Sequence, residues 1–166
     1  AYDLALHGVG EMTADLPLQP APEGWLSARG YAHLTEVQRA EASGPVRCVF
    51  AEGEVSLLAL HAPLQPVMLI TGADPTRSGE PPTSALIARS VGQSAAWVTL
   101  LEPFADAPTV ESVTVERVGD GLRVTVTHAD GSDEFELPQE LTGPITLRRL
   151  DAGGAVIAEE SAVSEP

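Results

Sequence analysis

The sequence predicts an all-β fold: an antiparallel β-sandwich of nine or more strands with two long loops, forming one domain over residues 1–166. Two observations lead to this prediction. Apolar and polar residues alternate with a period of two in many short segments, as they do when successive strand side chains point to opposite faces of a sheet. Clusters of glycine, proline and aspartate separate these segments, and no segment gives a clear helix prediction.

The clearest local prediction is a three-stranded meander between Val113 and Leu137. Its first two strands alternate apolar and polar residues on either side of Gly119-Asp120-Gly121. Residues of these types tolerate the positive φ angles that a tight hairpin turn requires. A second turn at Ala129-Asp130-Gly131-Ser132 leads into the third strand, Asp133 to Leu137.

Three further hairpins are predicted: Val46–Phe50 with Val55–Leu60, Ala85–Ser90 with Ala95–Leu101, and Ile145–Leu150 with Ala155–Glu159. The segment from Val55 to Leu60 is nearly all apolar, which is typical of a strand covered on both faces, so we expect it at the centre of the sandwich. In the second hairpin we expect Arg89 and Glu102 to form a cross-strand ion pair.

Two long segments rich in proline and glycine, Thr13–Gly30 and Gly72–Thr83, are predicted to be surface loops, and residues 163–166 a terminal tail. Loops of this length are where a sandwich would carry a binding site. The aromatic side chains of Trp25 and Tyr31 have two interpretations: they stack on a sugar ring, or they anchor the first loop to the core.

Composition excludes several partners. The formal net charge is −15, so the protein repels polyanions, and we expect neither nucleic acid nor a membrane as a partner. No apolar run approaches the roughly 20 residues that would span a bilayer. The single cysteine, Cys48, leaves no intrachain disulfide and no cysteine-based metal site.

No motif for catalysis or cofactor binding is present. The four histidines, His7, His33, His61 and His128, have no neighbouring ligand at metal-site spacing, although a site assembled from separate strands stays open. No serine lies in a nucleophile elbow, and His7-Gly8-Val9-Gly10 lacks the third glycine of a phosphate-binding loop. We therefore predict no catalytic residue, no metal ligand and no cofactor in this chain.

Three segments together resemble one family. They are Tyr2 to Gly8, the stretch from Ala88-Arg89-Ser90 to Trp97-Val98-Thr99-Leu100-Leu101-Glu102-Pro103-Phe104, and the hairpin from Val113 to Val126. They are similar to the C-terminal β-domain of heparinase II/III-like polysaccharide lyases, and the resemblance covers residues 1 to 137.

The resemblance implies a parent protein that cleaves uronic-acid polysaccharides by β-elimination, with an N-terminal helical toroid packed on this sandwich and a cleft between them. The family's catalytic residues and its zinc site lie upstream of the strand that corresponds to Tyr2–Gly8, so none of them carries over to this chain. The chain starts within a predicted strand, and we interpret it as a non-catalytic C-terminal piece that supports the cleft. The family also suggests a periplasmic or extracellular location.

Contact with the polysaccharide is expected at a local spot, because an acidic surface repels a polyuronate elsewhere. The candidate residues are Trp25, Arg29 and Tyr31 in or beside the first loop, and Arg77 in the second loop. Two alternatives stay open: a free-standing carbohydrate-binding or cell-surface adhesion sandwich, and a purely structural spacer.

Overall fold

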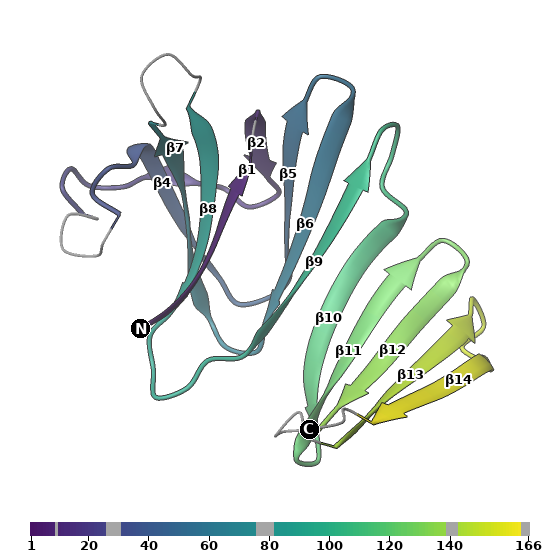
Figure 1. Cartoon of the computed structure of the whole chain (residues 1–166). Helices are drawn as coiled ribbons and strands as arrows, with labels where there is room; N and C mark the ends of the chain where they lie inside the picture. The colour runs from purple at the N-terminus through teal and green to yellow at the C-terminus, as the bar shows by residue number, and fades with distance from the viewer. Residues whose placement is uncertain (9, 26–30, 76–81, 139–142, 164–166) are drawn as a thin grey trace.

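The structure, a computed structural model, describes residues 1–8, 10–25, 31–75, 82–138 and 143–163. These residues form fourteen β-strands and no helix, and every strand pair is antiparallel (Figure 1). The predicted all-β sandwich is therefore confirmed. Since the described residues contain no helix, they also contain none with the length and apolarity to cross a membrane.

The strands form three sheets, which we name A, B and C. Sheet A has the order β1 (Tyr2–Gly8), β8 (Thr83–Ser90), β7 (Val67–Asp74), β4 (Thr35–Ala42) and β3 (Gln19–Pro20). Sheet B has the order β2 (Glu11–Ala14), β5 (Val46–Glu52), β6 (Val55–Pro63) and β9 (Trp97–Phe104). Sheet C runs in sequence order through β10 (Val110–Val118), β11 (Gly121–His128), β12 (Gly131–Leu137), β13 (Pro144–Asp151) and β14 (Val156–Val163).

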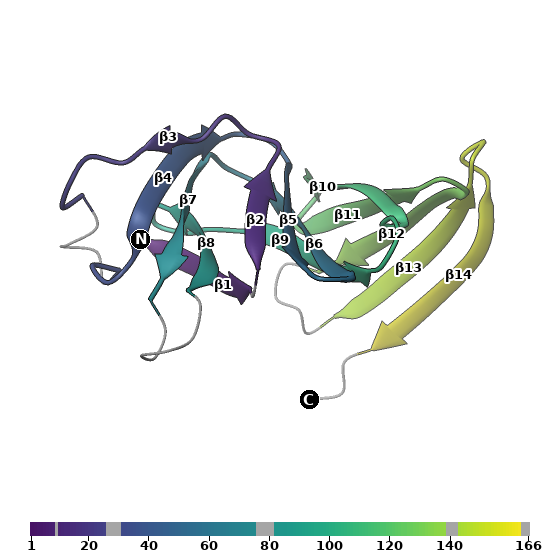
Figure 2. The same cartoon turned by 90° about the horizontal axis from the view of Figure 1, so that it is seen from above.

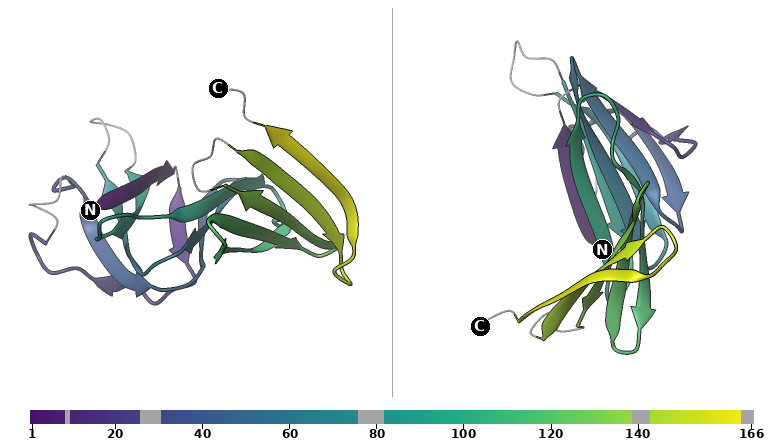
Figure 3. Two further views of the ribbon diagram at one scale, coloured as in Figure 1. Left: turned by 90° about the horizontal axis from the view of Figure 1, so that it is seen from below. Right: turned by 90° about the vertical axis from the view of Figure 1, so that its right-hand side faces the viewer.

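The three sheets stack as layers with sheet B in the middle (Figures 1 and 2). One apolar core lies between sheets A and B and includes Cys48, Phe50, Leu69 and Leu86. A second core lies between sheets B and C, where β6 and β9 pack on β10, β11 and β12. Strands β13 and β14 continue sheet C away from sheet A, which is visible from two further sides in Figure 3.

Strand β6 contributes to both cores, as its apolar sequence predicts. Leu57 and Ala59 face sheet A, whereas Leu58 and Leu60 face sheet C. Leu58 is fully buried. Because successive side chains of a strand point to opposite faces, only a strand that is apolar at every position can fill two cores at once.

The predicted meander and two of the predicted hairpins are confirmed. In the meander, β10 pairs with β11 and β11 with β12, and Gly119 at the first turn has a φ of 59°. The β5–β6 hairpin turns at Gly53, with a φ of 61°, and the β13–β14 hairpin closes the chain. Strand β14 continues to Val163, where the sequence predicted the start of a tail, and residues 164–166 lie outside the described part.

The predicted hairpin between Ala85–Ser90 and Ala95–Leu101 is wrong. Strand β8 lies between β1 and β7 in sheet A, whereas β9 is the edge of sheet B beside β6. The connection around Gly92 therefore carries the chain from one sheet to the other. Turn-forming residues suit a crossover as well as a hairpin, so the local sequence did not distinguish the two.

The Arg89–Glu102 ion pair is wrong for the same reason, since the two residues belong to different sheets. Arg89 binds Asp3 on the neighbouring strand β1. The carboxylate of Glu102 accepts hydrogen bonds from the hydroxyl and the N–H of Thr109 and from the N–H of Val110. The Thr109 hydroxyl is the main reason that the pKa of Glu102 lies below its usual value.

Both predicted loops are shorter than the sequence suggested. Thr13 and Ala14 belong to β2, and β3 interrupts the first loop at Gln19–Pro20. Gly72 to Asp74 complete β7, and β8 begins at Thr83. Residues 26–30 and 76–81 of these loops lie outside the described part.

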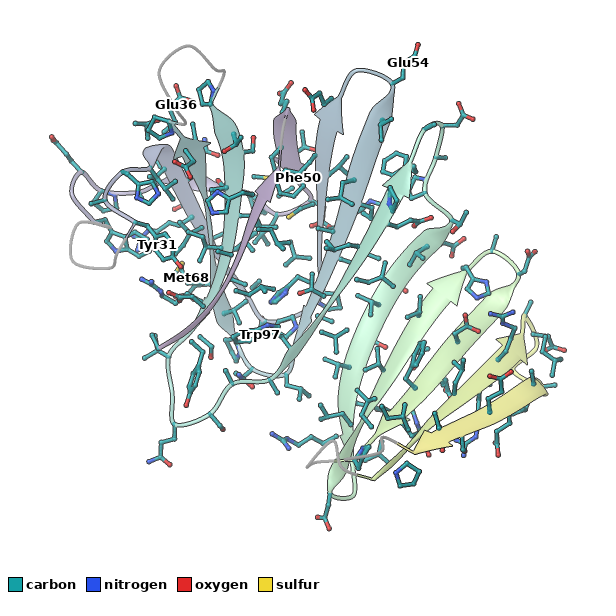
Figure 4. The ribbon with its side chains drawn as sticks, viewed as in Figure 1. Tyr31, Glu36, Phe50, Glu54, Met68 and Trp97 are labelled. Atoms are coloured by element: carbon teal, nitrogen blue, oxygen red, sulfur yellow. The ribbon has the colours of Figure 1, made fainter. Side chains whose placement is uncertain are left out.

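Glycines between β1 and β2 allow the chain to cross from sheet A to sheet B. A Cβ atom on Gly8 would collide with the ring of Phe50, a buried core residue (Figure 4). Gly10 has a φ of 88° and lies against the backbone of Ala51. The glycines that would belong to a phosphate-binding loop therefore have a packing role here.

The face of sheet C that points away from sheet B carries a row of alternating charges. Its ion pairs run from Glu116 to Arg123, Glu136, Arg148 and Glu159, so they link all five strands. These side chains are largely solvated, and exposed pairs contribute little stability individually. The row matches the observed register, in which Glu116 faces Arg123, Arg123 faces Glu136 and Arg148 faces Glu159.

His61 makes the folded protein sensitive to acid. It is 2% exposed between sheets A and B, its Nδ1 lies 2.9 Å from the hydroxyl of Thr99, and its Nε2 has no partner among the described residues. Burial lowers the pKa of His61 to about 4. The unfolded chain, in which this pKa is near 6.5, therefore binds more protons than the folded chain between these two values.

We predict that protonation of His61 in the unfolded chain does not reduce the free energy of unfolding above pH 6.5. As the pH falls from 6.5 toward 4, the free energy of unfolding decreases. The loss between pH 6.5 and pH 5 is expected to be about 2 kcal/mol. Urea denaturation at pH 6.5 and pH 5 measures it, with His61→Gln as the control. The same pH dependence in both proteins would show that His61 is not its source.

Candidate functional site

The candidate site lies on the face of sheet A that points away from sheet B. Trp25 and Tyr31, which both lie between β3 and β4 in the sequence, pack on an apolar cluster of this face. Figure 4 shows Tyr31 and Met68 on this side of the sheet. The buried members of the cluster are Leu34, Ile70, Ala85 and Ile87.

Tyr31 is held in place by a partly buried ion pair. The guanidinium of Arg89 donates to both carboxylate oxygens of Asp3, at 2.7 and 2.6 Å, and only 8% of Arg89 is exposed. The same guanidinium lies 5.6 Å from the centre of the Tyr31 ring. The hydrogen bonds from Arg89 lower the pKa of Asp3, and burial raises the pKa of Tyr31. Tyr31 therefore anchors the loop, which was one of its two predicted roles.

Trp25 has a different partner. The guanidinium of Arg39, on β4, lies over the Trp25 ring at 5.0 Å from its centre. Among the described residues, no carboxylate lies within ion-pair distance of Arg39, whereas Arg89, Arg123, Arg148 and Arg149 each have at least one. Stacking on an aromatic ring restricts the guanidinium while leaving its N–H groups able to donate.

Two concavities flank this pair. One, of about 300 Å³, is lined by Arg39 together with Leu16, Pro17, Gln19, Ala40, Glu41 and Met68. The other, of about 280 Å³, is lined by Trp25 and Tyr31 with Glu23, Leu34, Glu36, Val37 and their neighbours. The stacked pair thus contributes one side chain to each concavity. The site offers an aromatic surface, a cation, an amide and carboxylates within one area of sheet A.

A β-bulge in β4 shapes the second concavity. The pairing of β4 with β7 shifts between Thr35 and Gln38, so two residues of β4 face the single residue Gly72. Glu36, in this bulge, has a φ of 53°, which is uncommon for a residue with a side chain. The bulge places Val37 and Arg39 on the outer face, where they meet the β3–β4 connection.

The histidines are less isolated than their spacing suggested. His7 on β1 and His33 before β4 both approach Asp74 at the end of β7, at 3.2 Å and 3.7 Å. They contact different carboxylate oxygens, and no group of three histidine, cysteine, aspartate or glutamate side chains in the described part is arranged to hold a metal ion. His128 lies 3.7 Å from Asp133, in sheet C.

Of the four residues predicted to contact substrate, the structure brings Trp25 and Tyr31 into the lining of one concavity. Arg29 and Arg77 lie outside the described residues. Sequence reasoning missed Arg39 and Gln19, because it assigned no strand to Thr35–Ala42. The alternation of Val37, Arg39 and Glu41 on one face of that strand is the signal that would have placed Arg39 beside the loop.

Comparison with known proteins does not identify the chemistry of this site. No protein-family model and no curated protein sequence matches the chain. The chemical character of this site therefore comes from the Arg39–Trp25 pair and its two concavities.

Proposed function

We propose that the chain is the non-catalytic C-terminal β-sandwich portion of a heparinase II/III-like polysaccharide lyase, and that it contacts the polysaccharide through Trp25 and Arg39. The parent protein cleaves uronic-acid polysaccharides by β-elimination, and its helical toroid and this sandwich enclose the cleft. The catalytic residues and the zinc ligands belong to the parent outside this chain. The observation that carries the proposal is the stacked Arg39–Trp25 pair between two concavities.

The pair suits a ring that bears a carboxylate. The C–H face of a pyranose packs on an aromatic side chain, and a guanidinium donates two parallel hydrogen bonds to a carboxylate. Arg39 has no carboxylate partner among the described residues, so binding need not break an existing ion pair. The side chain of Gln19 lines the same concavity and can hydrogen-bond to hydroxyl groups.

The surrounding charge limits the contact to this spot. The net charge of −15 repels a polyanion, and Glu41 lines the same concavity as Arg39. The affinity for a single acidic sugar is therefore expected to be weak. It should rise with salt concentration wherever the repulsion between the acidic protein and the sugar carboxylate dominates, because salt screens that repulsion. Such a weak contact helps to hold a polysaccharide that is also bound in the parent's cleft. It does not by itself bind the polysaccharide tightly.

We predict that uronic-acid oligosaccharides bind the chain saturably and that Arg39→Ala weakens binding about tenfold, because a charge-assisted bidentate contact is lost. Trp25→Ala is expected to weaken it to a similar extent. Isothermal titration calorimetry measures both, with Arg117→Ala on an exposed part of β10 as the matched control.

Arg39→Lys separates charge from geometry, since lysine keeps the cation and loses the planar fork. It is expected to bind less tightly than the unchanged protein. Titrations without heat or saturation, or equal affinities for the Arg39 and Arg117 variants, would contradict the assignment of this contact.

We also predict that the chain alone releases no unsaturated uronate from alginate, heparan, hyaluronan or chondroitin. The double bond formed by β-elimination absorbs in the ultraviolet, so the growth of absorbance over time is the measurement. Turnover by the purified chain would place catalytic residues within it and overturn the proposal.

A free-standing carbohydrate-binding or adhesion sandwich is the second candidate. It is favoured by the position of the stacked pair, because Trp25 and Arg39 line two neighbouring concavities on the outer face of sheet A. Binding of neutral glycans that is lost in Trp25→Ala and unchanged in Arg39→Lys would favour this candidate over the lyase portion.

A further inference from the structure

Asp74 and Pro75 form an aspartate–proline peptide bond, the only one in the sequence. Asp74 is the last residue of β7 and pairs with Thr83 of β8, whereas Pro75 is exposed. The side-chain carboxylate of an aspartate can attack the backbone carbonyl carbon of the same residue. Proline forms a tertiary amide, whose nitrogen accepts a proton more readily than that of other residues and so leaves more easily. This bond therefore combines an internal nucleophile with a good leaving group at the end of a strand, where water has access.

Two histidines contact the Asp74 carboxylate. The Nδ1 atom of His7 lies 3.2 Å from Oδ2 of Asp74, and the Nε2 atom of His33 lies 3.7 Å from Oδ1. His7 belongs to β1 and His33 to the segment before β4, so the fold brings them to Asp74 from distant parts of the sequence. Their side chains are 44% and 51% exposed, and both can therefore exchange protons with water.

The charges that act directly on this carboxylate come from these two histidines. Among the described residues, His7 and His33 are the only basic side chains within ion-pair distance of Asp74. On the neighbouring strands, the residues that pair with the end of β7 are Thr35, Thr83 and Ser84, which carry no charge. Imidazole gains a proton between neutral and mildly acidic pH, so acid places positive charge and a proton donor beside the carboxylate.

We propose that the chain cleaves its own Asp74–Pro75 bond at mildly acidic pH, with Asp74 as the nucleophile and His7 and His33 as the proton donors. A carboxylate oxygen of Asp74 forms a bond to the backbone carbonyl carbon of Asp74, which closes a cyclic anhydride. The bond from this carbon to the Pro75 nitrogen breaks, and the nitrogen keeps the electron pair and takes a proton from an imidazolium. Water then opens the anhydride to two carboxylates, and the two protons released go to the imidazole and to the Pro75 amine.

The fold orders the reacting groups, which an unfolded chain does not. Contacts with two imidazoles restrict the Asp74 side chain, and pairing with Thr83 restricts its backbone. A similar contact in sheet C, of His128 with Asp133 at 3.7 Å, lacks the leaving group, because Asp133 is followed by Glu134. That pair is therefore an internal comparison in which no cleavage is expected.

Cleavage leaves the two pieces joined in one fold. Strand β7 ends the first piece and β8 belongs to the second, and the two strands pair from Met68 to Asp74. Strand β8 also pairs with β1, so the second piece is held between two strands of the first. The cut is therefore detected only after denaturation. This inference is independent of the proposed function, because it uses neither Trp25 nor Arg39.

Intact-mass spectrometry of the denatured chain tests the proposal after incubation for several days at about pH 6 and about pH 8. At the lower pH, pieces of residues 1–74 and 75–166 are expected, with masses that sum to the chain plus one water. Their formation should be about tenfold slower at the higher pH, because less imidazolium is present. It should also be about tenfold slower for the chain unfolded in urea at the lower pH, because the groups are no longer ordered.

Variants test the role of each group at the lower pH. Asp74→Ala removes the nucleophile and Pro75→Ala removes the leaving group while keeping the carboxylate and its contacts, so both are expected to give no pieces. The double variant His7→Ala/His33→Ala should react about tenfold more slowly or less, whereas the matched control His128→Ala should react at the unchanged rate. Circular dichroism checks that each variant is folded.

Three results would overturn the proposal: no pieces from the unchanged chain at the lower pH, equal rates for the folded and the urea-unfolded chain, or an unchanged rate in the double histidine variant. The second result would mean that the bond has only the lability of any aspartate–proline bond. The third would mean that the two histidines donate no proton to the reaction.

Discussion

The two-sided burial of sheet B is the constraint on which the rest of the structure depends. Strand β6 supplies Ala59 to the core shared with sheet A and Leu58 and Leu60 to the core shared with sheet C. Each fully buried leucine contributes about 1.5–3 kcal/mol, so the two outer sheets are held by the same strand. Sheet A is thereby held against sheet B, and its outer face carries the Arg39–Trp25 pair.

Local pattern was sufficient for the meander and for two of the hairpins, in which each strand pairs with the next one in sequence. The apolar run from Val55 to Leu60 predicted a central strand, and glycine-containing turns predicted the β10–β12 meander and the β13–β14 hairpin. Strands β2, β3, β4 and β7 were missed, and β8 was paired with the wrong strand. Strand β4 pairs with the distant β7, and β8 pairs with the distant β1 as well as with β7, which precedes it. A turn signal does not specify whether the chain returns to the same sheet or crosses to another.

The candidate site was likewise predicted only in part from the sequence. Aromatic residues in a loop pointed to Trp25 and Tyr31, but only the folded arrangement separates their environments. Tyr31 lies on a partly buried ion pair and anchors the loop, whereas Trp25 lies under a guanidinium that has no carboxylate partner among the described residues. Arg39 escaped prediction because its contact with Trp25 depends on the β4 bulge and on the path of the β3–β4 connection.

Native-state hydrogen exchange tests the central role of sheet B most directly. If β6 holds both outer sheets, the amides of Leu58 to Leu60 should exchange only through global unfolding, with the slowest rates in the protein. The amides of β8 and β11 should approach the same free energy of opening. Exchange of the β6 amides as fast as those of the edge strand β14 would contradict the account.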